Sequence, residues 1–71
     1  MTQVERIIRH MEDHGSITSL DAMTEYGIMR LASRINDLKA MGFNVKRVME
    51  SAKNRYGEPV SYARYYLEAK R

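Results

Sequence analysis

The 71-residue chain contains no cysteine, no tryptophan and a single proline. Because cysteine is absent, a disulfide framework and a thiolate metal site are both excluded. The two histidines, His10 and His14, are too few by themselves for a structural zinc site. No apolar run approaches the roughly 20 residues that cross a bilayer, and residues 1–14 lack the apolar core of a secretory signal. We therefore expect a cytoplasmic protein with no metal ion, cofactor or membrane contact.

The groupings of side chains that carry out catalysis are also missing. The sequence contains no recognisable Ser-His-Asp set, no phosphate-binding loop and no pair of acids at an apolar, buried position. We therefore expect that the protein is not an enzyme and that it has no small-molecule substrate.

Charge is distributed unevenly along the chain. Residues 1–29 carry two Lys or Arg against five acids, a net charge of −3, whereas residues 30–71 carry ten against four, a net charge of +6. A basic surface that faces a polyanion gives this kind of division. The length predicts a single small domain over residues 1–71, near the lower limit for an independent core. A dimer or a bound partner would add to the stability of so small a core.

Two helices are expected in the first part of the chain. Thr2 and Glu5 form a capping-box pattern at the start of a helix over about residues 2–14. Thr18 is a cap residue for a second helix over about residues 19–26, which Gly27 ends. Inward positions expected for this helix are Leu20, Ala22, Met23 and Tyr26.

A third helix is expected over about residues 29–41, ended by Gly42. Its length of roughly 20 Å would let it cross a DNA major groove. Its inward stripe has spacings of three and four and consists of Ile28, Leu31, Ala32, Ile35 and Leu38.

After Gly42 the pattern changes to an alternation of two residues, which is typical of strands. We expect strands over about residues 43–50 and 60–67, joined by the polar loop SAKNRYGEP. A short bridge from Ile17 to this hairpin also fits the sequence. The expected fold class is α+β, mainly α: a winged helix-turn-helix of three helices followed by a two-stranded hairpin, the wing.

The stretch GSITSLDAMTEYGIMRLASRINDLKAMGFNV, followed by a basic loop and VSYARYYL, resembles a small helix-turn-helix family common in phages and prophages. The resemblance covers about residues 3–67. It implies a DNA-binding winged domain without catalysis of its own, in the cytoplasm or nucleoid of a bacterial host. The residues that carry it are Gly15, Ser16, Ile17, Thr18, Gly27, Ile28, Arg30, Leu31, Arg34, Ile35, Leu38, Gly42 and Phe43.

The third helix supplies the main candidates for base contact. We expect either Arg30 or Arg34 to bind guanine O6 and N7 with two hydrogen bonds while the other binds phosphate. Asp37 repels phosphate, so it either orients Arg34 or accepts from a cytosine amine. A solvated helix face is the alternative interpretation. The full candidate set on this helix is Arg30, Ser33, Arg34, Asn36 and Asp37.

The wing supplies a second group of candidates. Its expected tip is a flexible loop with cationic and amide groups, suited to the minor groove or the DNA backbone, although an ordinary soluble turn would look the same. Lys46 and Arg47 begin the wing on opposite faces, and either is a candidate phosphate anchor. The tip residues are Lys53, Asn54, Arg55 and Tyr56.

The start of the second helix offers a third, weaker candidate site. Thr18, Ser19 and the amides beside them would bind a phosphate at the positive end of the helix, or they serve only as its cap.

These observations predict sequence-specific binding of double-stranded DNA by a small phage-type transcriptional regulator or architectural accessory factor. We also expect a homodimer on paired half-sites, because one such domain has a small footprint. The alternative is a protein-interaction module, such as a phage product that inhibits a host protein.

Overall fold

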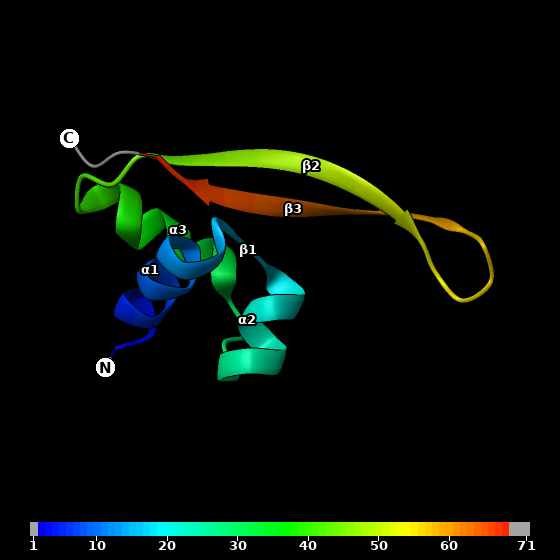
Figure 1. The fold of residues 1–71 in the computed structure, drawn as a ribbon, viewed down its shortest axis with the longest axis horizontal. Coiled ribbons are helices and arrows are strands. Elements are labelled where there is room, and N and C mark those ends of the chain that lie inside the picture. Colours follow the sequence, from blue (N-terminus) through cyan, green and yellow to red (C-terminus); the bar gives the residue numbers. More distant parts are fainter. Residues whose placement is uncertain (1, 69–71) are drawn as a thin grey trace.

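The computed structural model describes residues 2–68, over which three helices and three strands follow one another (Figure 1). Helices α1 and α2 keep the predicted bounds to within one residue, and the predicted bridge at Ile17 is confirmed as strand β1. The elements are α1 (Gln3–His14), β1 (Ser16–Thr18), α2 (Ser19–Tyr26), α3 (Leu31–Ala40), β2 (Val45–Lys53) and β3 (Pro59–Leu67).

The first two helices begin at the capping boxes that the sequence predicts. At α1, the Glu5 amide donates to Thr2 Oγ1 at 3.2 Å and the Thr2 amide donates to Glu5 Oε1 at 2.9 Å. Thr18 and Asp21 repeat this reciprocal pair at α2, with distances of 3.2 and 3.1 Å. Each pair satisfies two amides that have no partner within the helix. Gly27 then ends α2 in the left-handed conformation at φ 69°.

Helix α3 is shorter than predicted, because it begins at Leu31 rather than at residue 29. Arg30 precedes it with φ −120° and ψ 63°, and its side chain makes no capping hydrogen bond. The reason lies in Ile28, which is only 2 % exposed and fills the core from the connection after Gly27. Met29 and Arg30 therefore belong to this connection, and the expectation that Arg30 lies on the polar face of the helix is wrong.

The sheet has three antiparallel strands in the order β1-β3-β2, rather than the two-stranded hairpin predicted. Strands β2 and β3 pair one to one from Val45↔Leu67 to Lys53↔Pro59. The hairpin is thus longer than predicted, and its turn is shorter. Pro59 fits the first position of β3 because the β1 side is open there, so its missing N–H leaves no ladder bond unmade.

The core lies between the helices and one face of the sheet. Of the predicted inward residues of α2, Ala22 is buried, but Leu20 is 64 % exposed and Met23 is 44 % exposed. Ala32 of α3 is also exposed. These three expectations are wrong: α2 buries only the small Ala22, and α3 buries Leu31, Ile35 and Leu38 while Ala32 stays outside that stripe. The buried apolar residues are Ile7, Met11, Ile17, Ala22, Ile28, Leu31, Ile35, Leu38 and Tyr65.

One polar contact between α1 and α2 is largely shielded from water. His10 is 7 % exposed, and its Nδ1 lies 2.6 Å from the hydroxyl oxygen of Tyr26. The Arg6 guanidinium stands over the same tyrosine ring at 5.6 Å from the ring centre. The contact between His10 and Tyr26 holds α1 and α2 together. No group of three potential metal ligands occurs within residues 2–68.

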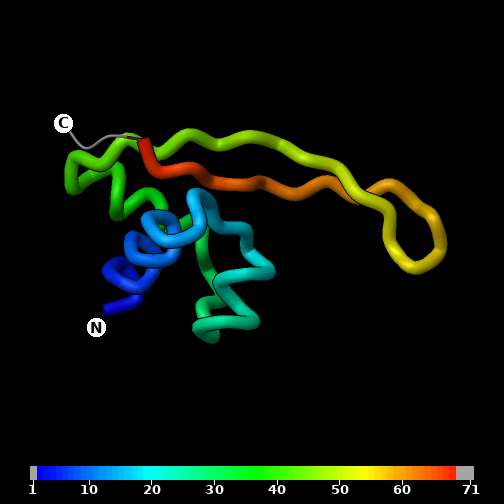
Figure 2. Tube along the Cα trace, in the orientation of Figure 1, coloured from blue at the N-terminus to red at the C-terminus, as the bar shows by residue number. Residues whose placement is uncertain are grey.

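The hairpin reaches well beyond the three helices, and Figure 2 shows the chain turning at its far end. The molecule measures 41 × 22 × 21 Å along its principal axes, so the projecting hairpin accounts for the elongated shape. β1 pairs only with Arg64, Tyr65 and Tyr66, which attaches the base of the hairpin to the helical body. Among residues 2–68, no helix is long and apolar enough to span a membrane.

We expect Tyr26→Phe to lower the free energy of unfolding by about 1 kcal/mol or somewhat more, because it leaves His10 without its partner. Urea denaturation measures this change. Tyr56→Phe is the matched control, since Tyr56 is 80 % exposed and should leave the unfolding midpoint where it is. Equal midpoints for both variants and the wild type would show that the buried contact adds no stability.

Candidate nucleic-acid interface

The outward face of α3 carries small and neutral side chains together with one acid, the exposed Asp37, which follows Ser33 by four residues. Ser33, Asn36 and Ala40 succeed one another at spacings of three and four, so they share the side opposite the buried Leu31 and Leu38. Asn36 is exposed and Ser33 is half-buried. A face of this kind allows the helix axis to approach a groove closely, with an amide and a hydroxyl available for base edges.

The cations of this region lie at the margins of α3. Arg34 is half-buried and pairs with Asp37 across 3.2 Å, with 38 % and 51 % of the two side chains exposed. An ion pair this exposed contributes little to stability, but it fixes the direction of the guanidinium. Arg30 is exposed, and no ion pair involves it within residues 2–68. Of the residues predicted for this helix, Arg34 and Asp37 thus form an ion pair, whereas Arg30 precedes the helix and takes no part in that pair.

The tip of the hairpin is an ordered turn organised by the side chain of Asn54. Its Oδ1 accepts from the amides of Tyr56 at 2.9 Å and Glu58 at 3.1 Å, and its Nδ2 donates to Glu58 Oε1 at 3.2 Å. Gly57 adopts φ 77° and donates to the Asn54 carbonyl oxygen at 3.0 Å. The Asn54 amide group is therefore engaged within the turn, which fits the ordinary turn that the sequence left open beside a DNA-contacting loop.

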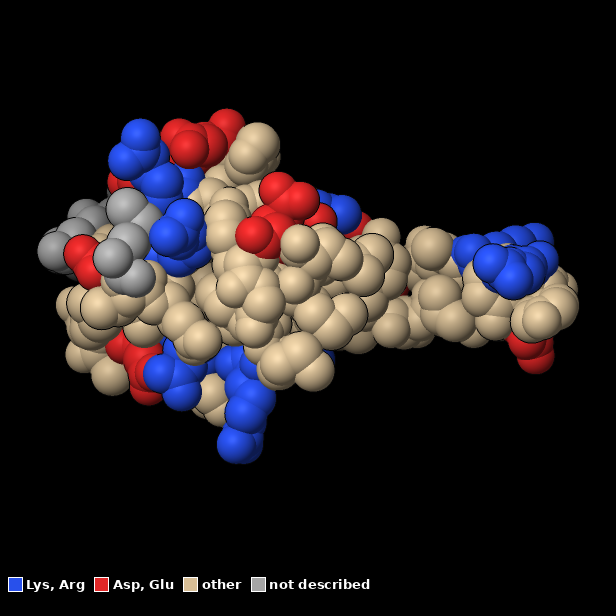
Figure 3. Space-filling view, turned by 90° about the horizontal axis from the view of Figure 1, so that it is seen from below, with Lys and Arg blue, Asp and Glu red and all other residues tan. Residues whose placement is uncertain are grey.

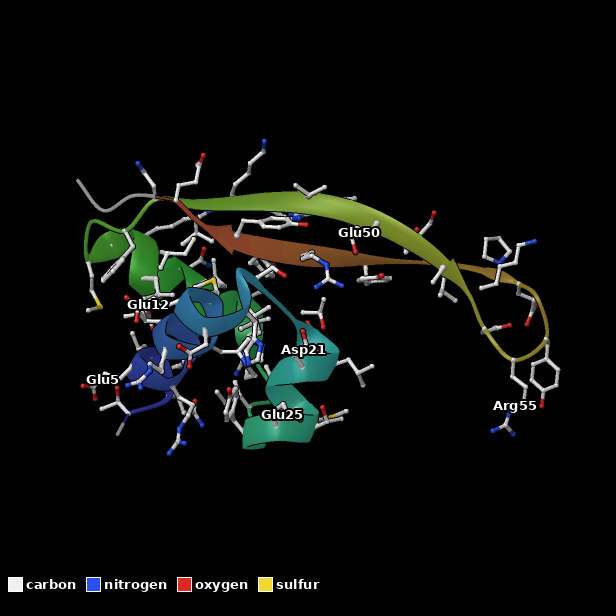
Figure 4. All side chains as sticks on the ribbon, viewed as in Figure 1. Glu5, Glu12, Asp21, Glu25, Glu50 and Arg55 are labelled. Atoms are coloured by element: carbon white, nitrogen blue, oxygen red, sulfur yellow. The ribbon has the colours of Figure 1, made fainter. Side chains whose placement is uncertain are left out.

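The remaining three tip residues project into solvent. Lys53, Arg55 and Tyr56 are all exposed, Tyr56 to 80 %. The hairpin of β2 and β3 forms an arm that projects from the three helices. Figure 3 shows cationic side chains gathered at the end of this arm, separated from the helices by an uncharged stretch. In Figure 4, Arg55 projects outward from the turn, away from α1 and α2. The tip is thus a compact cationic surface at one extreme of the molecule.

Lys46 and Arg47 begin β2 and point to opposite faces of the sheet, as the sequence predicts. Arg47 pairs in register with the buried Tyr65, and Lys46 pairs with Tyr66. Both side chains are exposed, and one Arg47 guanidinium nitrogen lies 3.4 Å from the sulfur of Met49. They stand at the base of the hairpin, at the opposite end of β2 from the tip.

Thr18 and Ser19 lie in an apolar groove of about 490 Å³ between the start of α2 and the hairpin. The Asp21 carboxylate accepts from the Thr18 amide, so an acid already occupies the positive end of the helix. This arrangement disfavours a phosphate there. The groove is lined by Thr18, Ser19, Leu20, Asp21, Ala52, Val60, Tyr62 and Arg64.

Acidic side chains are concentrated on the two helices that precede α3. Figure 4 places Glu5 and Glu12 on α1 and Asp21 and Glu25 on α2, away from Arg55 at the tip. The charge division seen in the sequence is therefore a division in space. A polyanion would be repelled by α1 and α2 and attracted to the hairpin tip.

A polar contact that the sequence does not predict fixes the base of the hairpin. Arg64 of β3 donates to Glu50 Oε1 of β2 at 2.9 Å and to Ser16 Oγ of β1 at 3.0 Å, so one side chain links three strands. The hydrogen bond from Arg64 holds the pKa of Glu50 below its ordinary value, and Glu50 in turn raises the pKa of Arg64. Alternation within each strand does not show which residues of the two strands share a face, and the register that brings Glu50 and Arg64 together is absent from the sequence.

Comparison with known proteins supports the same type of domain. A family described as a winged helix-turn-helix domain matches residues 2–70, which is nearly the whole chain. A winged helix-turn-helix domain is a DNA-binding, non-enzymatic kind of domain. Among curated proteins, no match is found.

We expect Glu50→Gln to destabilise the protein at neutral pH and less so in acid. The folded-state pKa of Glu50 lies below its ordinary value of 4.5, so its ionised form stabilises the fold above that value. This contribution is lost as the pH falls through the lowered pKa. Urea denaturation of both proteins at neutral and acidic pH measures the change.

Glu25→Gln is the control for this experiment, because Glu25 is exposed on α2 and belongs to none of the ion pairs formed within residues 2–68. It should alter stability little at neutral pH. A stability difference between Glu50→Gln and the wild type that stays constant across the pH range would contradict the role given to the Arg64 contact.

Proposed function

The chain belongs to the winged helix-turn-helix domain family, and on that basis we propose that it binds double-stranded DNA sequence-specifically through α3 and the hairpin tip. One observation carries the proposal. The same scaffold presents a helix face with short side chains, which lets the helix approach DNA closely, and an exposed cationic tip. Helix α3 reads base edges in the major groove, and the tip binds the neighbouring backbone or minor groove.

The proposed base reading rests on the side chains of α3. Ser33 and Asn36 supply short hydrogen-bonding groups on the outward face, where Asn is suited to adenine N6 and N7. Arg34, directed by Asp37, supplies the two-fold donor that guanine O6 and N7 accept. Arg30 lies outside the helix and serves as a phosphate contact.

The proposed backbone contacts rest on cations of the hairpin. Lys53 and Arg55 are exposed at the tip, and Lys46 and Arg47 are exposed at the base. The long axis of 41 Å is comparable to one turn of the duplex, which is roughly 34–36 Å, so both ends of the molecule reach the same site. The acidic surface of α1 and α2 then faces away from the DNA.

We further propose that the protein is a small regulator or architectural accessory factor of the phage or prophage type, working in the cytoplasm or nucleoid of a bacterial host. Its short recognition helix makes few base contacts, so a homodimer on two half-sites would raise its specificity. Thr18 and Ser19 are omitted from this interface because Asp21 adjoins them.

A protein partner is the second candidate, favoured by the apolar groove beside α2. Leu20 is 64 % exposed and Val60 is 41 % exposed at this groove. A contact surface for a host protein would have this apolar character. Titration with random-sequence duplex separates the candidates, since a DNA binder shows affinity that falls steeply as salt is raised.

We expect Arg34→Ala to reduce the preference for the selected site over random duplex by about 1–3 kcal/mol, because a two-fold guanine contact is lost. Lys53→Ala should weaken binding to all sequences alike and reduce the salt slope by about 1. Selection of duplexes from a random pool, followed by titration at several salt concentrations, measures both effects.

Leu20→Ser is the control, because it alters the exposed apolar groove and no residue of the proposed interface. Its affinity for duplex should equal that of the wild type. A loss with Leu20→Ser as large as the loss with Arg34→Ala would place the interface on the wrong side of the molecule.

A further inference from the structure

We infer that Tyr56 is a stacking wedge, which enters the minor groove between two base pairs and bends the duplex. This inference rests on the proposed DNA binding and adds a distinct activity to it, namely deformation of the DNA. It follows from the exposure of Tyr56, the order of the turn that carries it and the charges around it.

Tyr56 is 80 % exposed, the highest exposure among the large hydrophobic side chains of the described chain. A tyrosine ring provides 150–250 Å² of contact area when it is buried, so this residue gains almost none of its contact energy within the protein itself. No ring stacking or cation contact within residues 2–68 involves its ring. The ring therefore stands free to stack on a flat partner such as a base.

The turn that carries Tyr56 is ordered before any partner binds. The Tyr56 amide itself donates to Asn54 Oδ1 at 2.9 Å, and the Asn54 amide donates to the Glu58 carbonyl oxygen at 3.0 Å. Gly57 takes the positive φ that closes the loop. Because the backbone is already fixed, insertion of the ring costs less conformational entropy than it would from a disordered loop.

The charges at the tip favour approach to the minor groove. Lys53 and Arg55 both precede Tyr56 by three residues or fewer and are exposed. The carboxylate of the tip, Glu58, is held by the Asn54 side chain at 3.2 Å. Figure 3 shows the red atoms of the tip on the opposite side from the blue ones, so the cations occupy one side of the tip and the acid the other. Phosphates on both edges of a groove would attract that side.

The dimensions decide which part of the hairpin enters. Two paired strands stand about 4.8 Å apart between their backbones. With their side chains they exceed the minor groove of B-DNA, which is roughly 6 Å wide. The arm therefore stays outside, and only side chains of the tip reach the base pairs. The strand residues next to the tip bring no negative charge close to the phosphates; they are Ser51, Ala52, Val60 and Ser61.

Insertion of a side chain between base pairs partly unstacks them and kinks the duplex by roughly 20–90° toward the major groove. Pyrimidine–purine steps are the most easily unstacked, so the wedge would prefer them. This preference adds sequence selection at a position remote from α3. Bending of the duplex also fits the role of an architectural accessory factor.

The test uses a short duplex with a TA step at its centre and a donor and an acceptor dye at its two ends. Energy transfer at saturating full-length protein reports the end-to-end distance, and the titration reports affinity. The wild-type protein should shorten the end-to-end distance of the duplex. Tyr56→Ala should abolish the shortening and weaken binding about 5- to 100-fold, as expected for one lost stacking contact.

Tyr56→Phe and Arg55→Ala are the matched variants. The phenylalanine ring keeps the stacking surface, so Tyr56→Phe should bend the duplex as the wild type does. Arg55→Ala removes a cation beside the wedge, so it should weaken binding and reduce the salt slope by about 1 while leaving the bend at saturation. Both positions are in the exposed turn, so all three variants should fold, which circular dichroism checks.

Binding by the wild type without any shortening would overturn the wedge and leave the proposed function in place. Equal bending by Tyr56→Ala and wild type would also overturn it. Stronger binding to the isolated single strand than to the duplex would replace the wedge with simple base stacking. Absence of binding to any duplex at low salt would instead contradict the proposed function itself.

Discussion

The pairing of β3 with strands on both of its sides is the constraint on which the rest of the structure depends. At its base, β3 pairs with β1, where Tyr65 lies opposite Ile17 in the core. Along its whole length it pairs with β2. Arg64 adds a side-chain link across all three strands. A hairpin alone is marginally stable in water, so without this anchoring the arm would have no fixed direction relative to α3.

This anchoring divides the molecule into parts with different chemistry. The helices α1 and α2 carry five of the nine acids and the His10–Tyr26 contact, and they serve as the scaffold. Helix α3 turns a face of small polar residues outward, and the arm holds an ordered cationic turn at a distance. A chain of this size has little core to spare, so its functional groups lie on the surface while its buried groups determine only where that surface points.

Local signals in the sequence predicted the helix ends well, because capping boxes and terminal glycines act over three or four residues. They failed where long-range packing decides. Ile28 enters the core ahead of α3, which removes Arg30 from the helix, and Leu20 is exposed because the hairpin arm leaves an open groove beside it. Lys53 and Arg55 lie exposed at the end of the hairpin, where the sequence predicts them, whereas Arg30 lies outside the helix that was expected to carry it. The internal use of Asn54 and the Arg64–Glu50 pair depend on turn geometry and strand register, which the sequence alone does not reveal.

The proposed DNA binding requires one scaffold to bring α3 and the hairpin tip to the same duplex. Hydroxyl-radical footprinting on a selected site tests this most directly, because it records protection of each sugar along both strands. Two protected patches are expected for each protomer, one in a major groove and one in the adjoining minor groove. Truncating the turn to Gly-Gly in place of residues 54–58 should remove the minor-groove patch alone. A single protected patch that is unchanged by this truncation would show that the hairpin tip does not contact the duplex bound by α3.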